Sequence, residues 1–421
     1  MKLLIKQALV VDPNSPYNNK KVDLLIEDGI LTKIGKVDAS NADKTITSAG
    51  LCISPGWVDS FSHFTDPGYE HKETLDSGAA AASRGGFTDV LIVPNTNPVL
   101  HNKASVEYIL HKGQSLPATI HPIGAITRQT DGKELAEMYD MFENGAVAFS
   151  DGLRCIQSAG LLIKALQYVK AIDAVVIQVP DDYSINPSGL INEGITSTQL
   201  GLPGKPAIAE ELMVARDLAL CNYANSKLHL TGISTANSLQ LIQSAKKEAI
   251  SVSCSITPYH LFFSDEDLAN YNTNLKVNPP LRSKADRDAL RNAVKQGHVD
   301  CIASHHLPHE SDSKIVEFEH AQYGMIGLET AYAVTNTAVE NLTPLRTVEL
   351  FSINPRKIFG LETPTIDINQ KICFTLFDPT IEWTPEKQDL KSRSANSPFL
   401  GKKLQGKAIG TLHPNAISLF V

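Results

Sequence analysis

From Gly56 onward, the chain alternates between short apolar runs and longer amphipathic stretches. Each apolar run predicts a buried strand, and the eight runs are Trp57–Phe61, Thr88–Val93, Thr119–Ile123, Ala146–Phe149, Ala174–Gln178, Lys227–Leu230, Ser251–Ser255 and Asp300–Ala303. Apolar residues at three- and four-residue spacings between them predict helices, as in 158–170, 209–225, 235–247 and 284–296. Eight strand–helix units over roughly 250 residues are typical of an α/β protein built as a TIM-type (β/α)8 barrel.

Both ends of the chain instead have the texture of strands and turns. The predicted terminal strands are 3–11, 22–27, 30–36, 372–377 and 416–421. Because each end alone offers few strands, we expect them to pair into one small composite β-sandwich domain. The sequence therefore predicts this domain from residues 1–53 plus 363–421, beside a barrel over residues 54–362.

Composition narrows the class of protein. The chain has 421 residues, of which 42% are hydrophobic and 20% charged, as in an ordinary globular protein. A net charge of −8 without a Lys/Arg stripe argues against nucleic-acid binding. No stretch of eighteen apolar residues predicts a membrane span, and a cleavable leader is not apparent. We expect a cytoplasmic protein.

The cysteines are scattered and form no CxxC pair, which argues against a disulfide framework or a zinc knuckle. They are Cys52, Cys155, Cys221, Cys254, Cys301 and Cys373. Reduced thiols are the expectation.

Two predicted strand ends carry residues that suggest altered metal chemistry. A hydrolytic metal site on the first barrel strand would read His-x-His, whereas this chain has Phe61, Ser62 and His63. In the segment 302–309, His305 stands where the same chemistry requires an aspartate. A hydrolase scaffold that has lost its ligands predicts a changed role.

Several segments together resemble the dihydroorotases of the amidohydrolase superfamily, close to the multifunctional-complex and allantoinase-like branch. They follow the family order along the chain: Asp66–Gly68 with His71–Glu73, Val93–Pro98, Ala148–Asp151, Ile233–Thr235, Thr257–Pro258, Asn274–Arg282, Leu307–His309, Gly327–Thr330 and Asn396–Gly401. The resemblance implies a TIM-type barrel with a composite β domain. It also implies ancestry in the reversible cyclisation of N-carbamoyl-aspartate to dihydroorotate, a step of pyrimidine synthesis.

The resemblance also implies where zinc ligands are expected, on strands 1, 4, 5, 6 and 8. The corresponding positions here are Phe61 and His63, Asp151, Val179, Gly232 and His305. Phe, Val and Gly cannot donate a lone pair, so we expect no two-zinc cluster and no cofactor. A single zinc ion held by the vestigial set His63, Asp151 and His305 is the alternative. His229 could swing inward, although a packed strand residue is the preferred interpretation.

The substrate side of the resemblance is partly retained. The position of the arginine that grips the substrate carboxylate is Thr65, so the bidentate fork is lost. The positions that match the other substrate-binding residues are Asn95, Asn278 and His309. Asn95 and Asn278 also suit support of proline-flanked turns, and that alternative stays open. Arg282 and Arg154 are the candidates for a replacement cation.

Three functions compete. The first is a non-catalytic dihydroorotase homologue, a pseudoenzyme kept as a structural or regulatory partner of aspartate transcarbamoylase or of an active dihydroorotase. The second is an active dihydroorotase or cyclic amide hydrolase with a rearranged single-metal site, in which His305 would replace the catalytic aspartate. The third is a small-molecule binding module. We expect a homo-oligomer, and zinc content distinguishes the second function from the others.

Overall fold

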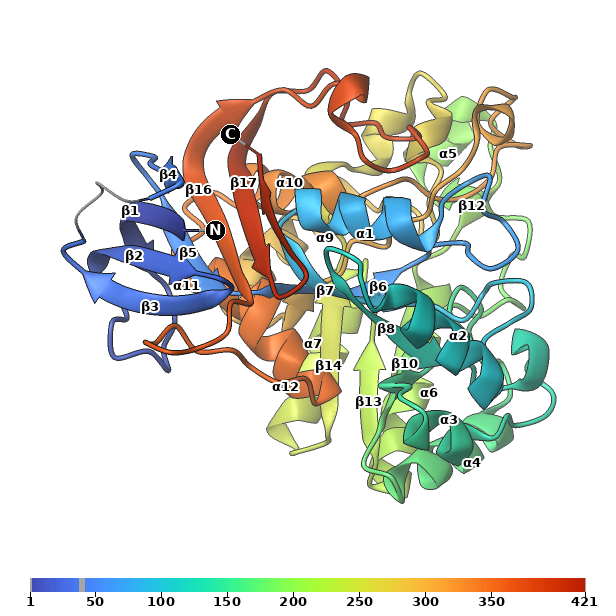
Figure 1. Ribbon diagram of the computed structural model, residues 1–421. Helices are drawn as coiled ribbons and strands as arrows, with labels where there is room; N and C mark the ends of the chain where they lie inside the picture. The colour runs from blue at the N-terminus through green and yellow to red at the C-terminus, as the bar shows by residue number, and fades with distance from the viewer. Residues whose placement is uncertain (1, 38–41, 421) are drawn as a thin grey trace.

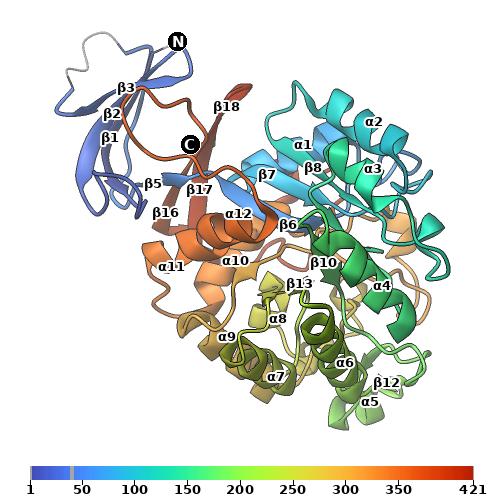
Figure 2. The same cartoon turned by 90° about the horizontal axis from the view of Figure 1, so that it is seen from below.

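The computed structural model describes residues 2–37 and 42–420. Eight parallel strands form one barrel-shaped sheet in the order β15-β14-β13-β10-β9-β8-β7-β6. Their bounds are β6 (Trp57–Ser62), β7 (Phe87–Ile92), β8 (Thr119–Gly124), β9 (Ala148–Phe149), β10 (Val175–Gln178), β13 (Lys227–Leu230), β14 (Val252–Ile256) and β15 (Cys301–Ile302). A parallel bridge between Ser62 and His306 brings the first and last strands together. The predicted TIM-type barrel is confirmed (Figure 2).

The barrel strands form where apolar runs are buried on both faces. All four residues of β10 and all six of β7 are buried, as expected for parallel strands covered by helices. The fourth and eighth strands are shorter than predicted, with two residues each. In β9, only Ala148 and Phe149 pair with β8. The predicted strand residues Ala146 and Val147 follow directly after a turn and are not part of the strand.

Helices surround the barrel in both views (Figures 1 and 2). Their bounds are α1 (Leu75–Arg84), α2 (Lys103–Gly113), α3 (Met138–Glu143), α4 (Ala159–Lys170), α5 (Ile195–Leu200), α6 (Ile208–Ala224), α7 (Ala236–Lys247), α8 (Pro258–Phe262), α9 (Lys284–Lys295), α10 (Ala331–Ala338), α11 (Pro344–Val348) and α12 (Asn354–Phe359). Ser158 and Ser283 cap α4 and α9 by accepting backbone N–H groups, which fixes their predicted starts. Within the described ranges, no helix is both long and apolar enough to span a membrane.

Strands from both ends of the chain share a second sheet, beside the barrel (Figure 1). The members are β1 (Lys2–Val10), β2 (Lys21–Glu27), β3 (Ile30–Gly35), β4 (Lys44–Ile46), β5 (Cys52–Pro55), β16 (Phe374–Trp383), β17 (Leu404–His413) and β18 (Ala416–Leu419). Antiparallel pairing of β5 with β16 joins the two ends. The hydrogen-bonded pairing of these strands forms one continuous sheet. The structure therefore does not show the two-sheet sandwich that the sequence predicts. The predicted domain limits stay a prediction, and Val421 of the last predicted strand lies outside the described residues.

The interior of the barrel is filled by a hydrophobic cluster that includes Val58, Leu91, Ile123 and Ile177. Phe61 at the end of β6 and Val179 just after β10 belong to the same cluster. Two positions at which the family resemblance implies zinc ligands are therefore part of the apolar core.

A cavity at the strand ends

A cavity of about 310 Å³ lies at the carboxyl ends of the barrel strands, where barrel proteins carry their sites. Its wall includes several residues singled out from the sequence, namely Phe61, His63, Thr65, Val179, Asn278, His305 and His309. The other lining residues are Tyr69, Lys72, Leu153, Tyr259, Val277, His306, Leu307, Pro308, Gln322, Tyr323 and Gly324. Asn95 and Asp151 are not among the residues that line the cavity.

His305 fills the space in front of Gly232. A Cβ built on Gly232 would lie 2.8 Å from Cε1 of His305. Gly232 also has a φ of +72°, a backbone conformation that residues with a side chain rarely adopt. On its other side, the His305 ring packs on Phe61 with the ring centroids 4.5 Å apart. We call Phe61, Val179, Gly232 and His305 the ligand face. A ring, an alkyl group and a hydrogen stand at three of its four positions.

A chain of hydrogen bonds holds the His305 ring in place. Ser255 Oγ donates to Thr231 Oγ1 at 2.7 Å, and Thr231 Oγ1 is in turn hydrogen-bonded to Nε2 of His305, also at 2.7 Å. At the far end of the chain, His229 bonds Ser255 through Nε2 and Ser253 through Nδ1. Burial lowers the pKa of His305 to about 3 and that of His229 to about 4.

His63 and Asp151, which follow β6 and β9, are each hydrogen-bonded to the loop that follows a neighbouring strand, β7 and β8 respectively. His63 Nε2 donates to the backbone oxygen of Asn95 at 2.8 Å, while its Nδ1 is buried without a hydrogen-bond partner. Burial lowers the pKa of His63 to about 4. Asp151 accepts the backbone N–H of Thr127 at 2.8 Å and the Thr127 hydroxyl on its other oxygen. Burial raises the pKa of Asp151 to about 6.

These donors do not combine into a metal site. In the described parts of the chain, no group of three or more His, Cys, Asp or Glu side chains is placed to hold a metal ion. Of the three vestigial candidates, Asp151 is bonded to Thr127 and His305 is bonded to Thr231 through Nε2, whereas Nδ1 of His63 is buried without a hydrogen-bond partner. The donor set therefore does not fit the two-zinc cluster that the family resemblance implies.

The two asparagines of the expected substrate site are engaged by the protein itself. Asn95 donates to the backbone oxygen of Asp151 at 3.0 Å and accepts the backbone N–H of Leu153 at 2.9 Å. Asn278 donates to Asp181 at 3.1 Å and accepts from Lys205 at 3.4 Å. Lys205 and Asp181 form a largely buried ion pair at 2.5 Å. Both asparagines thus support loops, and their role in substrate binding remains a prediction.

Lys72 forms the cationic end of the cavity, beside the neutral ring of His309. His309 Nε2 donates to the backbone oxygen of Tyr323 at 2.9 Å, so its Nδ1 accepts from Lys72 Nζ at 3.5 Å. Burial lowers the pKa of His309 to about 4. Arg282 is instead committed to Glu210, with its Nη2 at 3.6 Å from Oε2.

Arg154, the other candidate cation, and Thr65, at the position of the lost arginine, are both hydrogen-bonded to the protein backbone. Arg154 donates to the backbone oxygen of Thr130 at 3.4 Å. Thr65 donates to the backbone oxygen of Glu73 at 2.8 Å and has a φ of +58°. Neither residue supplies the bidentate cation that a carboxylate would require.

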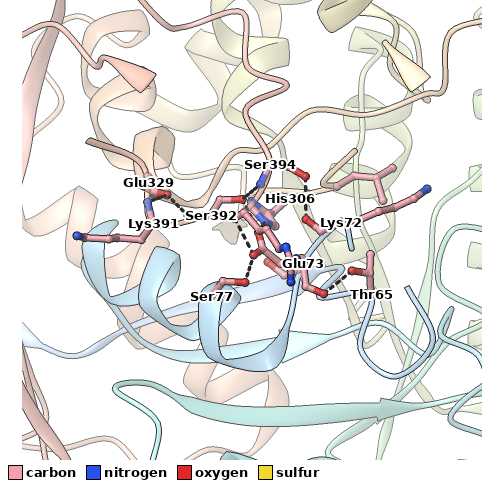
Figure 3. A network of polar contacts seen from close by, with 12 residues as sticks. Thr65, Lys72, Glu73, Ser77, His306, Glu329, Lys391, Ser392 and Ser394 are labelled. Atoms are coloured by element: carbon pink, nitrogen blue, oxygen red, sulfur yellow. Dashed lines mark hydrogen bonds and ion pairs between the residues drawn. The ribbon is translucent and has the colours of Figure 1, made fainter. Parts of the chain in front are cut away.

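A buried carboxylate beside the cavity joins three distant segments of the chain. Glu73 accepts from Ser77, from His306 Nε2 at 3.3 Å, from the Ser392 hydroxyl, and from the backbone N–H of Arg393 at 3.0 Å. Figure 3 shows Glu73 at the centre of this network, with the Lys72 side chain directed away from it. We call Glu73, Ser77, His306, Ser392 and Arg393 the Glu73 clamp.

The charge state of the clamp follows from its contacts. His306 Nδ1 accepts the backbone N–H of Gly327 at 3.2 Å, so Nε2 carries the proton that it gives to Glu73. Burial alone would raise the pKa of Glu73, but the bonds from His306, Ser392 and Ser77 hold it below its usual value. The clamp is an ionised carboxylate surrounded by donors.

Sequence reasoning missed both Lys72 and the Glu73 clamp. Lys72 and Glu73 both lie in the segment His71–Glu73, which was used only as part of the family resemblance. The available signal was a Glu directly before the cap Thr74, whose side chain accepts the N–H of Ser77 at the start of α1.

Comparisons with known proteins agree with this architecture. A family model described as dihydro-orotase-like matches residues 50–238. The dihydroorotase of Pelobacter propionicus is 39% identical over 416 residues, which cover 98% of each chain. The dihydroorotase of Acetivibrio thermocellus is 40% identical over 415 residues, which cover 97% of each chain.

Among solved structures, the L-hydantoinase (dihydropyrimidinase) of Arthrobacter aurescens superposes with a TM-score of 0.84 over 100% of this chain and 97% of its own, at 23% identity. A D-hydantoinase (dihydropyrimidinase) of Thermus sp. gives 0.80 over 99% of this chain and 94% of its own, at 18% identity. At such identities the structures show a shared fold. The near-full-length likeness at about 40% identity shows more: the chain belongs to the dihydroorotase family.

Proposed function

We propose that this protein is a non-catalytic member of the dihydroorotase family, kept in the cytoplasm as a structural or regulatory partner of a catalytic enzyme. Aspartate transcarbamoylase is the first partner to test, and an active dihydroorotase is the second. The proposal assigns no bound zinc and no turnover to the chain on its own.

The observation that carries this proposal is the position of His305. Its ring lies where a side chain at position 232 would project, and it packs against Phe61. Restoring a ligand at Gly232 would thus require moving His305, and restoring one at Phe61 would open the apolar cluster. The surrounding side chains are packed around the substituted positions, so a single substitution would not restore a ligand.

Loss of the base supports the same proposal. A strand-8 aspartate would accept a proton as a carboxylate near neutral pH. His305 is neutral, and its Nε2 is bonded to Thr231 at 2.7 Å. Its low pKa makes this side chain a weak proton acceptor at the position where the reaction needs a base.

Zinc content and turnover test the proposal together. The protein is purified without chelator, in parallel with the dihydroorotase of Acetivibrio thermocellus as a matched control. We expect far less than one zinc per chain by elemental analysis and no measurable hydrolysis of dihydroorotate. About two zinc ions per chain, or turnover on the order of 1 s⁻¹ or more, would contradict the proposal.

The single-zinc alternative has one observation in its favour, the unpartnered buried Nδ1 of His63. The same elemental analysis decides it. Near-stoichiometric zinc that is lost in a His63→Gln variant would favour that alternative over a non-catalytic role.

The partner role needs its own experiment. The chain is mixed at micromolar concentration with aspartate transcarbamoylase from the same organism, and the mixture is followed by sedimentation velocity. We expect a faster-sedimenting species that contains both chains. Two independent boundaries would argue against this partner, and the active dihydroorotase would then be tested in the same way.

A further inference from the structure

Lys72 places a positive charge on the cavity wall. Among the described residues that line the cavity, none is Asp or Glu, and Lys72 is the single Lys or Arg. Its Nζ lies 3.5 Å from Nδ1 of His309 and 3.7 Å from Oε2 of Glu310. The latter separation is longer than a hydrogen bond, and this buried oxygen of Glu310 has no hydrogen-bond partner. The ammonium group therefore has only a loose carboxylate neighbour.

Two histidines of the cavity wall, His306 and His309, are neutral, because Nδ1 of each ring accepts a hydrogen bond, from the Gly327 N–H and from Lys72 respectively. Burial also lowers the pKa of His309 to about 4. His309 presents an acceptor nitrogen to Lys72 and gives its proton to Tyr323. A ligand that enters the cavity thus meets the positive charge of Lys72.

The rest of the wall favours an apolar, flat ligand body. Phe61, Val179, Tyr259, Val277 and Tyr323 contribute rings and alkyl groups to the lining. Flat rings pack well against such aromatic side chains. Asn278 already donates one N–H to Asp181 and accepts from Lys205, so its amide has a single N–H left for the polar groups of a ureide ring.

We propose that the cavity binds a small aromatic monocarboxylate, with its carboxylate on Nζ of Lys72 and its ring against the apolar wall. The site differs from the carboxylate grip that the family resemblance implies, since Thr65 replaces that arginine and is bonded to Glu73. The inference rests on the proposed function, because such a ligand occupies the cavity without being converted. Glu310 competes with the ligand carboxylate for Lys72.

Benzoate and its neutral counterpart benzamide are the probes, titrated by calorimetry into chelator-treated protein. We expect benzoate to bind roughly tenfold more tightly than benzamide, which corresponds to one charge-assisted hydrogen bond. Lys72→Met keeps the alkyl stem and should remove this preference. Lys133→Met is the matched control, because Lys133 is 80% exposed and pairs with Asp131 on the surface.

A second variant guards against misfolding as an explanation. Glu310→Gln removes the competing carboxylate and should strengthen benzoate binding several-fold, a gain that a damaged protein cannot show. Equal affinity for benzoate and benzamide, or no gain in Glu310→Gln, would overturn the anion site. Tighter binding of dihydroorotate than of benzoate would overturn the apolar ligand body.

These outcomes are separable from a failure of the proposed function. Binding is measured on metal-depleted protein without turnover, whereas zinc content and hydrolysis are measured on untreated protein. An active enzyme would refute the non-catalytic role whatever its benzoate affinity. An inactive protein that does not prefer benzoate would refute only the ligand class.

Discussion

The ligand face and the Glu73 clamp are neighbours at the same end of the barrel, since His305 belongs to one and His306 to the other. On the ligand face, Phe61 and Val179 have joined the hydrophobic core, and His305 fills the space beside Gly232. In the clamp, a fully buried carboxylate keeps a complete set of donors. The adjacent residues His305 and His306 thus belong to two different environments, one mainly apolar and one built from hydrogen bonds to a carboxylate.

The difference separates what the fold requires from what the reaction requires. The clamp connects the segments around residues 73, 306 and 392, so the shape of the barrel mouth depends on it. On the ligand face, apolar packing by Phe61 and Val179 is enough to hold the structure together. A protein kept for its shape would retain the first and could lose the second, in agreement with the proposed non-catalytic role.

The largest effect is expected from Glu73→Gln. The amide cannot accept from all of the donors that face Glu73, and its own N–H groups would point at other N–H and O–H groups. Removing one partner of a buried charged network costs about 3–5 kcal/mol. We expect the free energy of unfolding in urea to fall by about this amount. A loss below about 1 kcal/mol, as for an ordinary surface change, would break the comparison.

The matched control is Glu107→Gln on an exposed position of α2, which should change the free energy of unfolding by less than about 0.5 kcal/mol. Acid should weaken the wild-type clamp. The pKa of Glu73 is lowered in the folded protein, so its stabilising contribution is present above the ordinary value of 4.5 and is lost as pH falls through the lowered value.

A second prediction concerns His229, which is fully buried beneath the ligand face. Its folded pKa is about 4, against 6.5 for an unperturbed histidine. Between these values the unfolded chain binds a proton that the folded protein does not, so stability falls as pH decreases. One such histidine costs up to roughly 1.4 kcal/mol per pH unit.

We therefore expect the loss of stability between pH 6.5 and pH 5 to be smaller in His229→Gln, by roughly 1.5 kcal/mol. Urea unfolding at both pH values measures it. His111→Gln, on an exposed position of α2, should leave the pH dependence unchanged. An unchanged pH dependence in His229→Gln would mean that His229 takes up its proton in the folded protein.

Much of the fold could be predicted from the sequence because apolar periodicity is a local signal. The helix starting at Lys284 and the strand over Lys227–Leu230 were placed correctly, since caps and buried runs are read from neighbouring residues. The strand Leu404–His413 was missed, because its small and polar residues give no clear alternation. The single continuous sheet of the terminal domain depends on pairing between the two chain ends, which local patterns do not contain.

The site was harder to predict, for a reason that the clamp illustrates. The burial of Glu73 depends on Ser392, which lies 319 positions further along the chain. Local sequence patterns carry no information about a hydrogen-bond partner that is so distant along the chain. The family resemblance identified the substituted positions Phe61 and Gly232, but not that His305 packs between them.

A smaller effect is expected from Gly232→Ala, which tests whether His305 truly fills the ligand face. The new methyl group meets Cε1 of His305 at 2.8 Å, and the φ of +72° adds backbone strain. Gly132→Ala is the matched control, with the same φ of +72° and nothing within 4 Å.

We expect Gly132→Ala to cost about 1 kcal/mol of stability from strain alone and Gly232→Ala about 1 kcal/mol more. The excess should disappear when Gly232→Ala is made in a His305→Ala background, as a double-mutant cycle in urea unfolding would show. Equal costs of the two glycine substitutions in the wild-type background would mean that His305 moves freely out of the ligand face.

The smallest effect is expected from His305→Asp alone, which should produce no measurable turnover of dihydroorotate. The new carboxylate would be a general base with no activated nucleophile beside it, because Phe61, Val179 and Gly232 still lack imidazoles. Catalytic groups that act as a unit are not additive, so repair of one rescues almost nothing. Removal of the His305 ring is nevertheless required before a side chain fits at position 232. Combining the change with Phe61→His, Val179→His, Gly232→His and Thr65→Arg should therefore recover some zinc binding, measured by elemental analysis, while His305→Asp alone stays without zinc. Turnover by the single variant on the order of 1 s⁻¹ would mean that the ligand face already holds a working metal centre.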